Sequence, residues 1–124
     1  MSEAELPPWL KEQFARFEQL QQNLQAVLAQ KQQVEAEQAE AGKALEELNK
    51  SANSDMIFKF AGNLLIKVQK DAIMKELAEK KELASTRSLV LAKQEARFRA
   101  NLKEIQVKID ESIKGGRPRA MEGE

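Results

Sequence analysis

Residues 56–68 read MIFKFAGNLLIKV, and this stretch decides how the rest of the chain is interpreted. Two short apolar segments flank Gly62 and Asn63, a pattern that is typical of a β-hairpin. A lone two-stranded hairpin is marginally stable in water, and both of its edges expose unpaired backbone groups. We therefore expect the hairpin to mediate assembly by pairing with other subunits in a closed sheet or barrel. The alternative is that it folds back onto its own helices.

The positions of the apolar side chains predict the length of the hairpin loop. A two-residue loop, Gly62-Asn63, would place Phe58 opposite Lys67 and divide the apolar side chains between two faces. A three-residue loop, residues 61–63, would gather them on one face, because the register of the strands sets the face. We therefore predict the three-residue loop, with an apolar oligomerisation face made of Met56, Phe58, Phe60, Leu64, Ile66 and Val68.

The stretch before the hairpin carries an apolar stripe at alternating spacings of three and four residues. Pro7-Pro8 suits the start of a helix, since proline is tolerated in the first turn. Nine of the twelve stripe positions are apolar, which predicts a helix over residues 7–49 with a coiled-coil seam. The seam positions are Leu10, Gln13, Phe17, Leu20, Leu24, Val27, Lys31, Val34, Gln38, Ala41, Leu45 and Leu48.

A second helix is predicted over residues 71–114, with Asp71 as its N-cap. Leu83 and Val90 broaden its apolar face in the middle. Its seam, which is stronger toward the C-terminus, contains Leu77, Ala84, Leu91, Phe98, Leu102, Ile105 and Ile109.

The end of the chain and the similar lengths of the helices complete the predicted fold. Gly115-Gly116 ends the second helix, and residues 115–124 are expected to form a disordered tail. Each helix would be on the order of 65 Å long at about 1.5 Å per residue. The fold class is mainly α: a single domain with a long antiparallel two-helix coiled coil and one β-hairpin at the connection. The two ends of the chain then meet at one tip.

The composition excludes several classes of function. The 124 residues include 20 basic and 20 acidic side chains, so no basic excess indicates a nucleic-acid partner. There is no His, Cys or Tyr, so we expect no enzyme, cofactor or metal site. No apolar run is long enough to cross a membrane, and the first residues lack the pattern of a signal peptide. We therefore expect a cytoplasmic protein.

The sequence around and within the hairpin resembles the prefoldin family. The first helix is rich in glutamine, as in QLQQ at residues 19–22, and KALEEL at 43–48 precedes the break. The resemblance is closest in the hairpin, with IFK at 57–59 and GNLLIKV at 62–68. A single hairpin between the helices is similar to the beta-type subunit, particularly the archaeal form, because the alpha-type has two. The similarity covers roughly residues 10–113.

This resemblance implies a function and a set of partners. Prefoldin is an ATP-independent co-chaperone, a hetero-hexamer of two alpha-type and four beta-type subunits whose hairpins join into a β-barrel body. Its coiled coils hold unfolded client proteins at their tips and pass them to a group II chaperonin. The implied partners are an alpha-type subunit, further beta-type subunits, unfolded proteins and the chaperonin, with no nucleic acid and no membrane. Phe60 and Ala61 are more apolar than the residues expected there, and Trp9 looks particular to this chain.

The resemblance places client binding at the tip. Four candidate residues also fit the seam, and we expect them to pack between the helices: Leu10, Phe17, Ile105 and Ile109. Four others fall off the seam, and we expect them to be exposed: Trp9, Phe14, Val107 and Ile113. Several such arms would hold a non-native chain through multivalency. The alternative function is a structural coiled-coil tether, or an oligomerisation module, without client binding.

Overall fold

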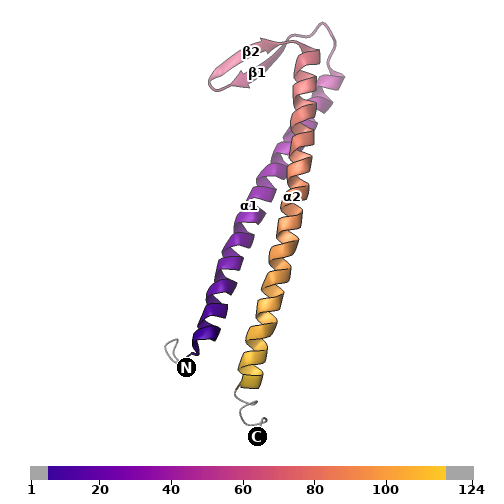
Figure 1. Ribbon diagram of the computed structural model, residues 1–124. Helices are drawn as coiled ribbons and strands as arrows, with labels where there is room; N and C mark the ends of the chain where they lie inside the picture. Colours follow the sequence, from indigo (N-terminus) through magenta and orange to yellow (C-terminus); the bar gives the residue numbers. More distant parts are fainter. Residues whose placement is uncertain (1–5, 117–124) are drawn as a thin grey trace. The chain divides into compact units, whose positions relative to one another are not determined.

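The computed structural model describes residues 6–116, which form two long helices separated by one β-hairpin (Figure 1). This element order confirms the predicted fold class. The elements are α1 (Pro8–Lys50), β1 (Ile57–Ala61), β2 (Leu64–Val68), α2 (Lys70–Glu111) and a π-helical turn (Ser112–Gly116). Gly115 and Gly116 belong to this last turn. Residues 117–124, the rest of the predicted tail, lie outside the described residues.

The chain divides into two compact units. We call residues 6–29 with 91–116 the terminal unit, and residues 30–90 the hairpin unit. The terminal unit pairs the first turns of α1 with the last turns of α2, and the hairpin unit contains the connection between the helices.

The terminal unit has a small apolar core. Its three buried members are Leu10, Ile105 and Ile109, and the half-buried side chains packed against them are those of Leu6, Phe17 and Leu20. Helix α1 begins at Pro8, as the two prolines predict. The Pro7 carbonyl oxygen accepts the first hydrogen bonds of the helix, from the amides of Leu10 and Lys11 at 3.0 and 3.1 Å. The core therefore lies beside a well-defined helix start.

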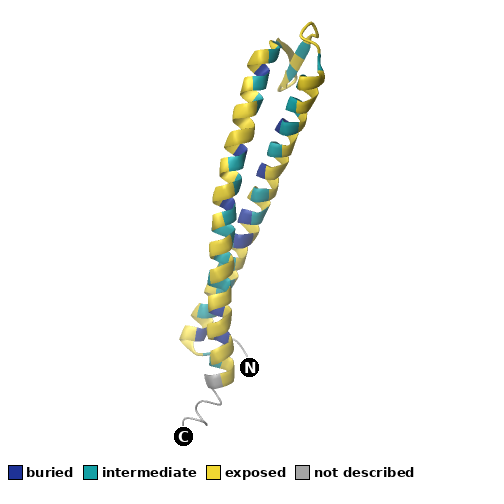
Figure 2. Ribbon diagram, turned by 90° about the vertical axis from the view of Figure 1, so that its right-hand side faces the viewer, coloured by how far each residue is buried: buried dark blue, intermediate teal, exposed yellow. Residues whose placement is uncertain are grey.

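The hairpin unit buries a sparse set of small and medium side chains between its two helical segments, chiefly Val34, Ala41, Ile73 and Ala84. Ile73 was not among the predicted seam positions. Figure 2 shows buried and half-buried residues recurring along one side of each helix. Along α1 as a whole, all twelve predicted seam positions are buried or half-buried, so the periodicity located the packed face.

Local hydrogen bonds hold the connection between α1 and the hairpin. The Ser51 amide and hydroxyl both donate to the Leu48 carbonyl oxygen, at 3.2 and 2.7 Å, which closes the last turn of α1. Asp55 accepts from the Ala52 amide at 2.8 Å and donates its own amide to the Ala52 carbonyl at 3.0 Å. Lys70, the first residue of α2, reaches back to the Ser51 carbonyl at 2.9 Å. The turn-favouring residues therefore build an ordered turn.

The prediction that Asp71 caps α2 is wrong. The Ile73 amide donates to the Gln69 carbonyl at 3.0 Å, so Gln69 is the capping position and the helix begins at Lys70. Asp71 lies inside the first turn. Its carboxylate is favourable there because the free amides at a helix N-terminus carry a partial positive charge.

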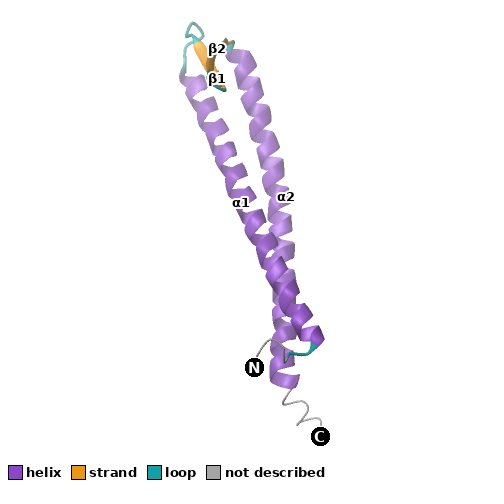
Figure 3. Cartoon of the chain, turned by 90° about the vertical axis from the view of Figure 1, so that its left-hand side faces the viewer, coloured by secondary structure: helices purple, strands orange, loops and turns teal. Residues whose placement is uncertain are grey.

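The predicted three-residue loop is also wrong. Phe60 pairs with Leu65 and Ala61 pairs with Leu64, which leaves a two-residue loop at Gly62-Asn63. Figure 3 shows the two strands in orange between the ends of the purple helices. Gly62 has a φ of 62°, and no non-glycine residue within 6–116 has a positive φ. A left-handed glycine at the first central position is the signature of a type II′ turn, whose twist matches that of the flanking strands.

The observed register divides the apolar residues between two faces, because paired residues share a face. We call one the Lys59 face: Ile57, Lys59, Ala61, Leu64, Ile66 and Val68. We call the other the Lys67 face: Phe58, Phe60, Leu65 and Lys67. The predicted single face is therefore split, and Met56 precedes β1. Burial specifies the register of a strand pair only where one face of the pair is covered. Here neither face is fully buried, and the two-residue turn at Gly62-Asn63 sets the register.

Candidate functional site

Two exposed apolar surfaces are the candidate sites, one in each unit. They are described separately below. Both consist of side chains that the helical seam does not use.

The first surface lies on the terminal unit. Its members, Trp9, Phe14, Val107 and Ile113, are all exposed, with 48% of Trp9 and 39% of Phe14 accessible. The remaining candidates divide as the seam predicts: Leu10, Ile105 and Ile109 are buried and Phe17 is half-buried. The unit therefore combines a packed core with aromatic and aliphatic side chains that face solvent. Their role as client contacts remains a prediction.

One seam position of the terminal unit, Gln13, carries an unsatisfied polar atom. The Oε1 atom of Gln13 is buried and has no hydrogen-bond partner. A buried carbonyl oxygen without a donor costs about 1–3 kcal/mol. Gln13 occupies a seam position one turn from both Leu10 and Phe17, so the packing of this unit is weaker than an all-apolar seam would give.

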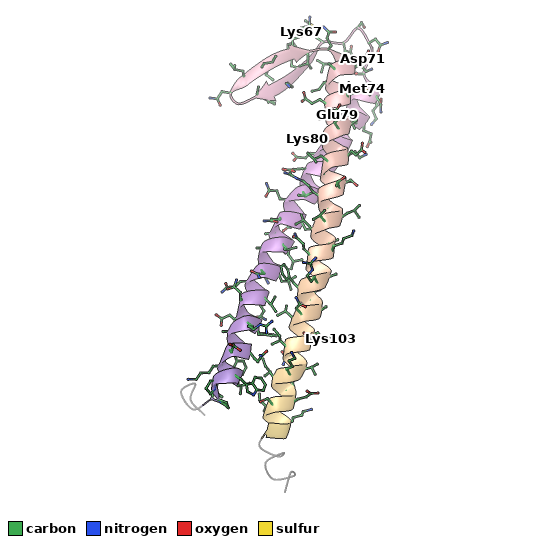
Figure 4. All side chains as sticks on the ribbon, in the orientation of Figure 1. Lys67, Asp71, Met74, Glu79, Lys80 and Lys103 are labelled. Atoms are coloured by element: carbon green, nitrogen blue, oxygen red, sulfur yellow. The ribbon has the colours of Figure 1, made fainter. Side chains whose placement is uncertain are left out.

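The second surface is the hairpin. Leu64 and Ile66 are exposed on the Lys59 face, and Phe58, Phe60 and Leu65 are exposed on the Lys67 face, with 80% of Phe60 accessible. Figure 4 shows Lys67 on the side of the hairpin that points away from α2. Within residues 6–116 the two strands pair only with each other, so both edges of the hairpin are free. The Lys67 face is open, whereas Ile57, Lys59 and Val68 on the Lys59 face are half-buried.

An ion pair joins the hairpin to α2. The Nζ atom of Lys59 lies 3.2 and 3.4 Å from the two carboxylate oxygens of Glu76. The Lys59 face is therefore the face of the hairpin that contacts α2.

The part of the chain that the structure describes offers little else for chemistry. No group of three or more His, Cys, Asp or Glu residues within 6–116 could hold a metal ion. No helix among the same residues is both long and apolar enough to cross a membrane.

Sequence reasoning missed three contributors to these surfaces. Ile57 and Leu65 were assigned no role because the predicted three-residue loop placed them on the face opposite the apolar one. Glycine followed by asparagine between two apolar strands was the available signal, since a two-residue hairpin loop favours glycine at its first position. The contact between Lys59 and Glu76 had no signal, because it spans 17 residues and depends on how the hairpin leans.

Comparisons of the sequence with a family model and with individual proteins point to the same family. Residues 11–116 match the family described as "Prefoldin subunit". The chain is 43% identical over 105 residues to the prefoldin subunit beta of Archaeoglobus fulgidus, covering 85% of this chain and 90% of the relative. It is 39% identical over 123 residues to that of Pyrobaculum neutrophilum, covering 97% and 98%.

A solved structure agrees with the sequence relatives. The fold matches the crystal structure of the prefoldin beta subunit from Thermococcus strain KS-1 with a TM-score of 0.77 and 35% identity. The match covers 87% of this chain and 95% of that one. The chain therefore belongs to the prefoldin subunit family, among its beta-type members.

Proposed function

We propose that this subunit holds unfolded proteins on the exposed side chains of its terminal unit, without ATP, and delivers them to a group II chaperonin in the cytoplasm. The prefoldin family is a family of non-enzymatic co-chaperones whose subunits assemble with one another. The finer steps, client binding and delivery, are our proposal. The observation that carries it is the exposure of Trp9, Phe14, Val107 and Ile113 beside a packed core.

Exposed apolar side chains suit a binder of non-native chains. An unfolded protein presents apolar segments in no fixed arrangement, so a defined pocket would not recognise it. Aromatic side chains contribute large contact areas, and Trp9 and Phe14 both lie near the start of α1. Each contact is weak, but several subunits acting on one chain raise the overall affinity through effective concentration. The proposed partners in such an assembly are an alpha-type subunit and further beta-type subunits.

The hairpin is the proposed assembly element. Its Lys67 face, the exposed Leu64 and Ile66 and both of its edges are uncovered within residues 6–116, and association with other hairpins would cover them. Closure into a β-barrel is part of this proposal. The exposure of Phe58, Phe60 and Leu65 supports this proposal over the alternative that the hairpin folds back, because only the Lys59 face contacts α2.

The test is aggregation suppression by the assembled complex. We would mix the chain with an alpha-type subunit and measure light scattering from a denatured enzyme, with no nucleotide present. Replacing Trp9, Phe14 and Ile113 by serine should weaken suppression while native mass stays unchanged. A matched control replaces three exposed charged neighbours by serine, namely Lys11, Arg16 and Lys108.

The outcomes separate the two candidate functions. Unchanged suppression by the apolar variant would refute client binding at these residues. An assembly that never suppresses aggregation would favour the structural tether. Delivery is tested separately: adding a group II chaperonin with ATP should raise the yield of refolded enzyme from the held state.

A further inference from the structure

Lys70, the first residue of α2, lies where the electrostatics of a helix disfavour a cation. The free amide groups at a helix N-terminus carry a partial positive charge, so acidic side chains are favourable there and basic ones are not. Asp71, the next residue, follows this rule, whereas Lys70 does not. A residue that breaks a local preference is expected to have a compensating contact elsewhere in the fold.

The compensating contact is with the end of α1. The Nζ atom of Lys70 donates to the carbonyl oxygen of Ser51 at 2.9 Å and to the Oδ1 atom of Asn53 at 3.4 Å. Ser51 directly follows α1, and the carbonyl oxygens at a helix C-terminus carry a partial negative charge that favours a cation. One ammonium group therefore joins the C-terminal end of α1 to the N-terminal end of α2. We call these two hydrogen bonds the Lys70 clamp.

The Lys70 clamp closes the segment that contains the hairpin. Ser51 and Lys70 are 19 residues apart, and the connecting turn and both strands lie between them. Figure 1 shows the chain leaving the end of α1, passing through β1 and β2 and returning at the start of α2. A bond that joins the two ends of a segment lowers the conformational freedom of the residues between them.

The rest of the hairpin base is open to solvent. A hollow of about 340 Å³ lies there, lined by residues 53–57 and 67–71. Within residues 6–116, the other side-chain bond between the hairpin and α2 joins Lys59 to Glu76, whose side chains are 39% and 57% exposed. The bond from Lys70 to Ser51 is partly buried, so water competes with it less. The Lys70 clamp is therefore the more protected polar contact at this base.

We propose that Lys70 is a positioning residue for assembly: its clamp holds the hairpin in one orientation on the ends of α1 and α2 before a partner binds. The proposal rests on assembly through the hairpin, as in the proposed function, and names the residue that prepares the hairpin for it. Lys70 bonds within its own subunit, so it acts on assembly without a contact with the partner. An ordered element associates more tightly than a mobile one, because it loses less conformational entropy on binding.

Substitutions of two lysines isolate the clamp. Lys70→Met keeps a long side chain and removes the donors, whereas Lys70→Arg keeps a cation with donors. The matched control is Lys75→Met, which removes an exposed cation from the same helix. Methionine and arginine are good helix formers, as lysine is. Circular dichroism checks that each variant is as helical as the parent chain.

The first measurement is the orientation of the hairpin in the single chain. The parent chain has no cysteine, so Asn63→Cys in the hairpin turn and Glu79→Cys on α2 give two unique sites for nitroxide labels. Pulsed electron paramagnetic resonance, with labelled chains diluted in unlabelled ones, gives the distribution of distances between the labels. We expect Lys70→Met to broaden this distribution, and Lys70→Arg and Lys75→Met to keep the width of the parent.

The second measurement is the stability of the complex. Each chain, without labels, is mixed with an alpha-type subunit, and dissociation on dilution is followed by native mass spectrometry. We expect the complex of Lys70→Met to dissociate at concentrations about tenfold higher than that of the parent. Lys70→Arg should restore the parent behaviour, because the bond to Ser51 needs a cationic donor rather than a particular side-chain shape.

Several results would overturn the proposal. An unchanged distance distribution in Lys70→Met would show that the clamp does not hold the hairpin. A broader distribution with unchanged dissociation would show that the orientation of the hairpin does not affect assembly. A loss of helicity in Lys70→Met would show that the lysine stabilises the helices themselves.

Phe60→Ser, a change on the exposed Lys67 face, separates this proposal from the proposed function. If Phe60→Ser weakens the complex and Lys70→Met does not, hairpin assembly stands and positioning by Lys70 fails. If neither variant weakens the complex, hairpin assembly itself is refuted, and this proposal with it. A parent complex that assembles but suppresses no aggregation refutes the holding function, and weaker assembly of Lys70→Met then still supports positioning.

Discussion

Lys59 on β1 and Glu76 on α2 form an ion pair across the base of the hairpin, with Nζ 3.2 Å from Oε1. Both side chains are partly exposed, so solvent screens their attraction. Such a pair contributes little to stability.

Lys59→Gln is expected to lower the free energy of unfolding by no more than about 1 kcal/mol, because exposed ion pairs are worth about 0–1 kcal/mol. Urea denaturation at low and high salt measures this, and the difference from the parent should shrink in high salt. Lys67→Gln is the control, since Lys67 lies on the opposite face and forms no ion pair within residues 6–116. A loss of several kcal/mol would show that the pair is structural.

Gln13→Leu is expected to stabilise the terminal unit by about 1–2 kcal/mol. The change removes a buried carbonyl oxygen that has no partner and adds apolar surface to a seam position. Thermal unfolding followed by circular dichroism at equal protein concentration gives the measurement. Gln21→Leu, at an exposed position of the same helix, should bring no such gain. A lower melting temperature for Gln13→Leu would mean that the site cannot accommodate the branched side chain.

Ile105→Ala is expected to cost about 2–5 kcal/mol, because Ile105 is 2% accessible and sits in the core of the terminal unit. Val107→Ala, two residues later and exposed, should change stability by less than about 0.5 kcal/mol. Chemical denaturation of the two variants distinguishes core from surface. Equal losses would contradict the burial that the structure assigns.

Gly62→Ala is expected to weaken the hairpin by about 1–2 kcal/mol, because alanine pays a steric cost at a φ of 62°. Nothing lies within 4 Å of the position a Cβ would take, so the whole effect comes from the backbone. Gly62→Asn should lose less, since asparagine tolerates the left-handed region. Amide hydrogen exchange of the strand residues reports the difference. Similar protection in all three chains would argue against the turn type.

Gly42→Ala is expected to stabilise α1 by up to about 1 kcal/mol, which is the difference in helix propensity. A Cβ at this position would meet the Lys81 side chain at 3.7 Å, an ordinary contact with a flexible group. The glycine therefore does not serve a close approach of the helices. A melting temperature below that of the parent would show that Lys81 cannot adjust.

The helical part of this fold was largely predictable, because packing between two helices leaves a periodic trace in sequence. Leu24, Val27 and Val34 are buried where the spacing of three and four residues places them. The same reasoning separated Ile105 and Ile109, which are buried, from Val107 and Ile113, which are exposed. Periodicity carries this information whenever one face of a helix is covered within the chain.

The hairpin was not predictable in the same way. Its register was inferred from the assumption that one face gathers the apolar residues, and the structure pairs Phe60 with Leu65 instead. That assumption holds when a face is buried within the subunit, whereas here neither face is. The local preference of Gly62 for a left-handed conformation decided the register. The N-cap of α2 was predicted too late in the chain because an aspartate is favourable throughout the first turn of a helix. The presence of Asp71 therefore does not by itself identify the capping residue.

The exposed apolar side chains of the hairpin have a consequence for the amount of this subunit that a cell can hold without its partners. A copy made without partners exposes the apolar Lys67 face and both edges of its hairpin to water, a combination that natural sheets avoid because it promotes aggregation. Surplus copies would pair with one another or with unrelated strands. A cell that makes this chain is therefore expected to match its synthesis to that of its partners, or to degrade the orphan subunits quickly.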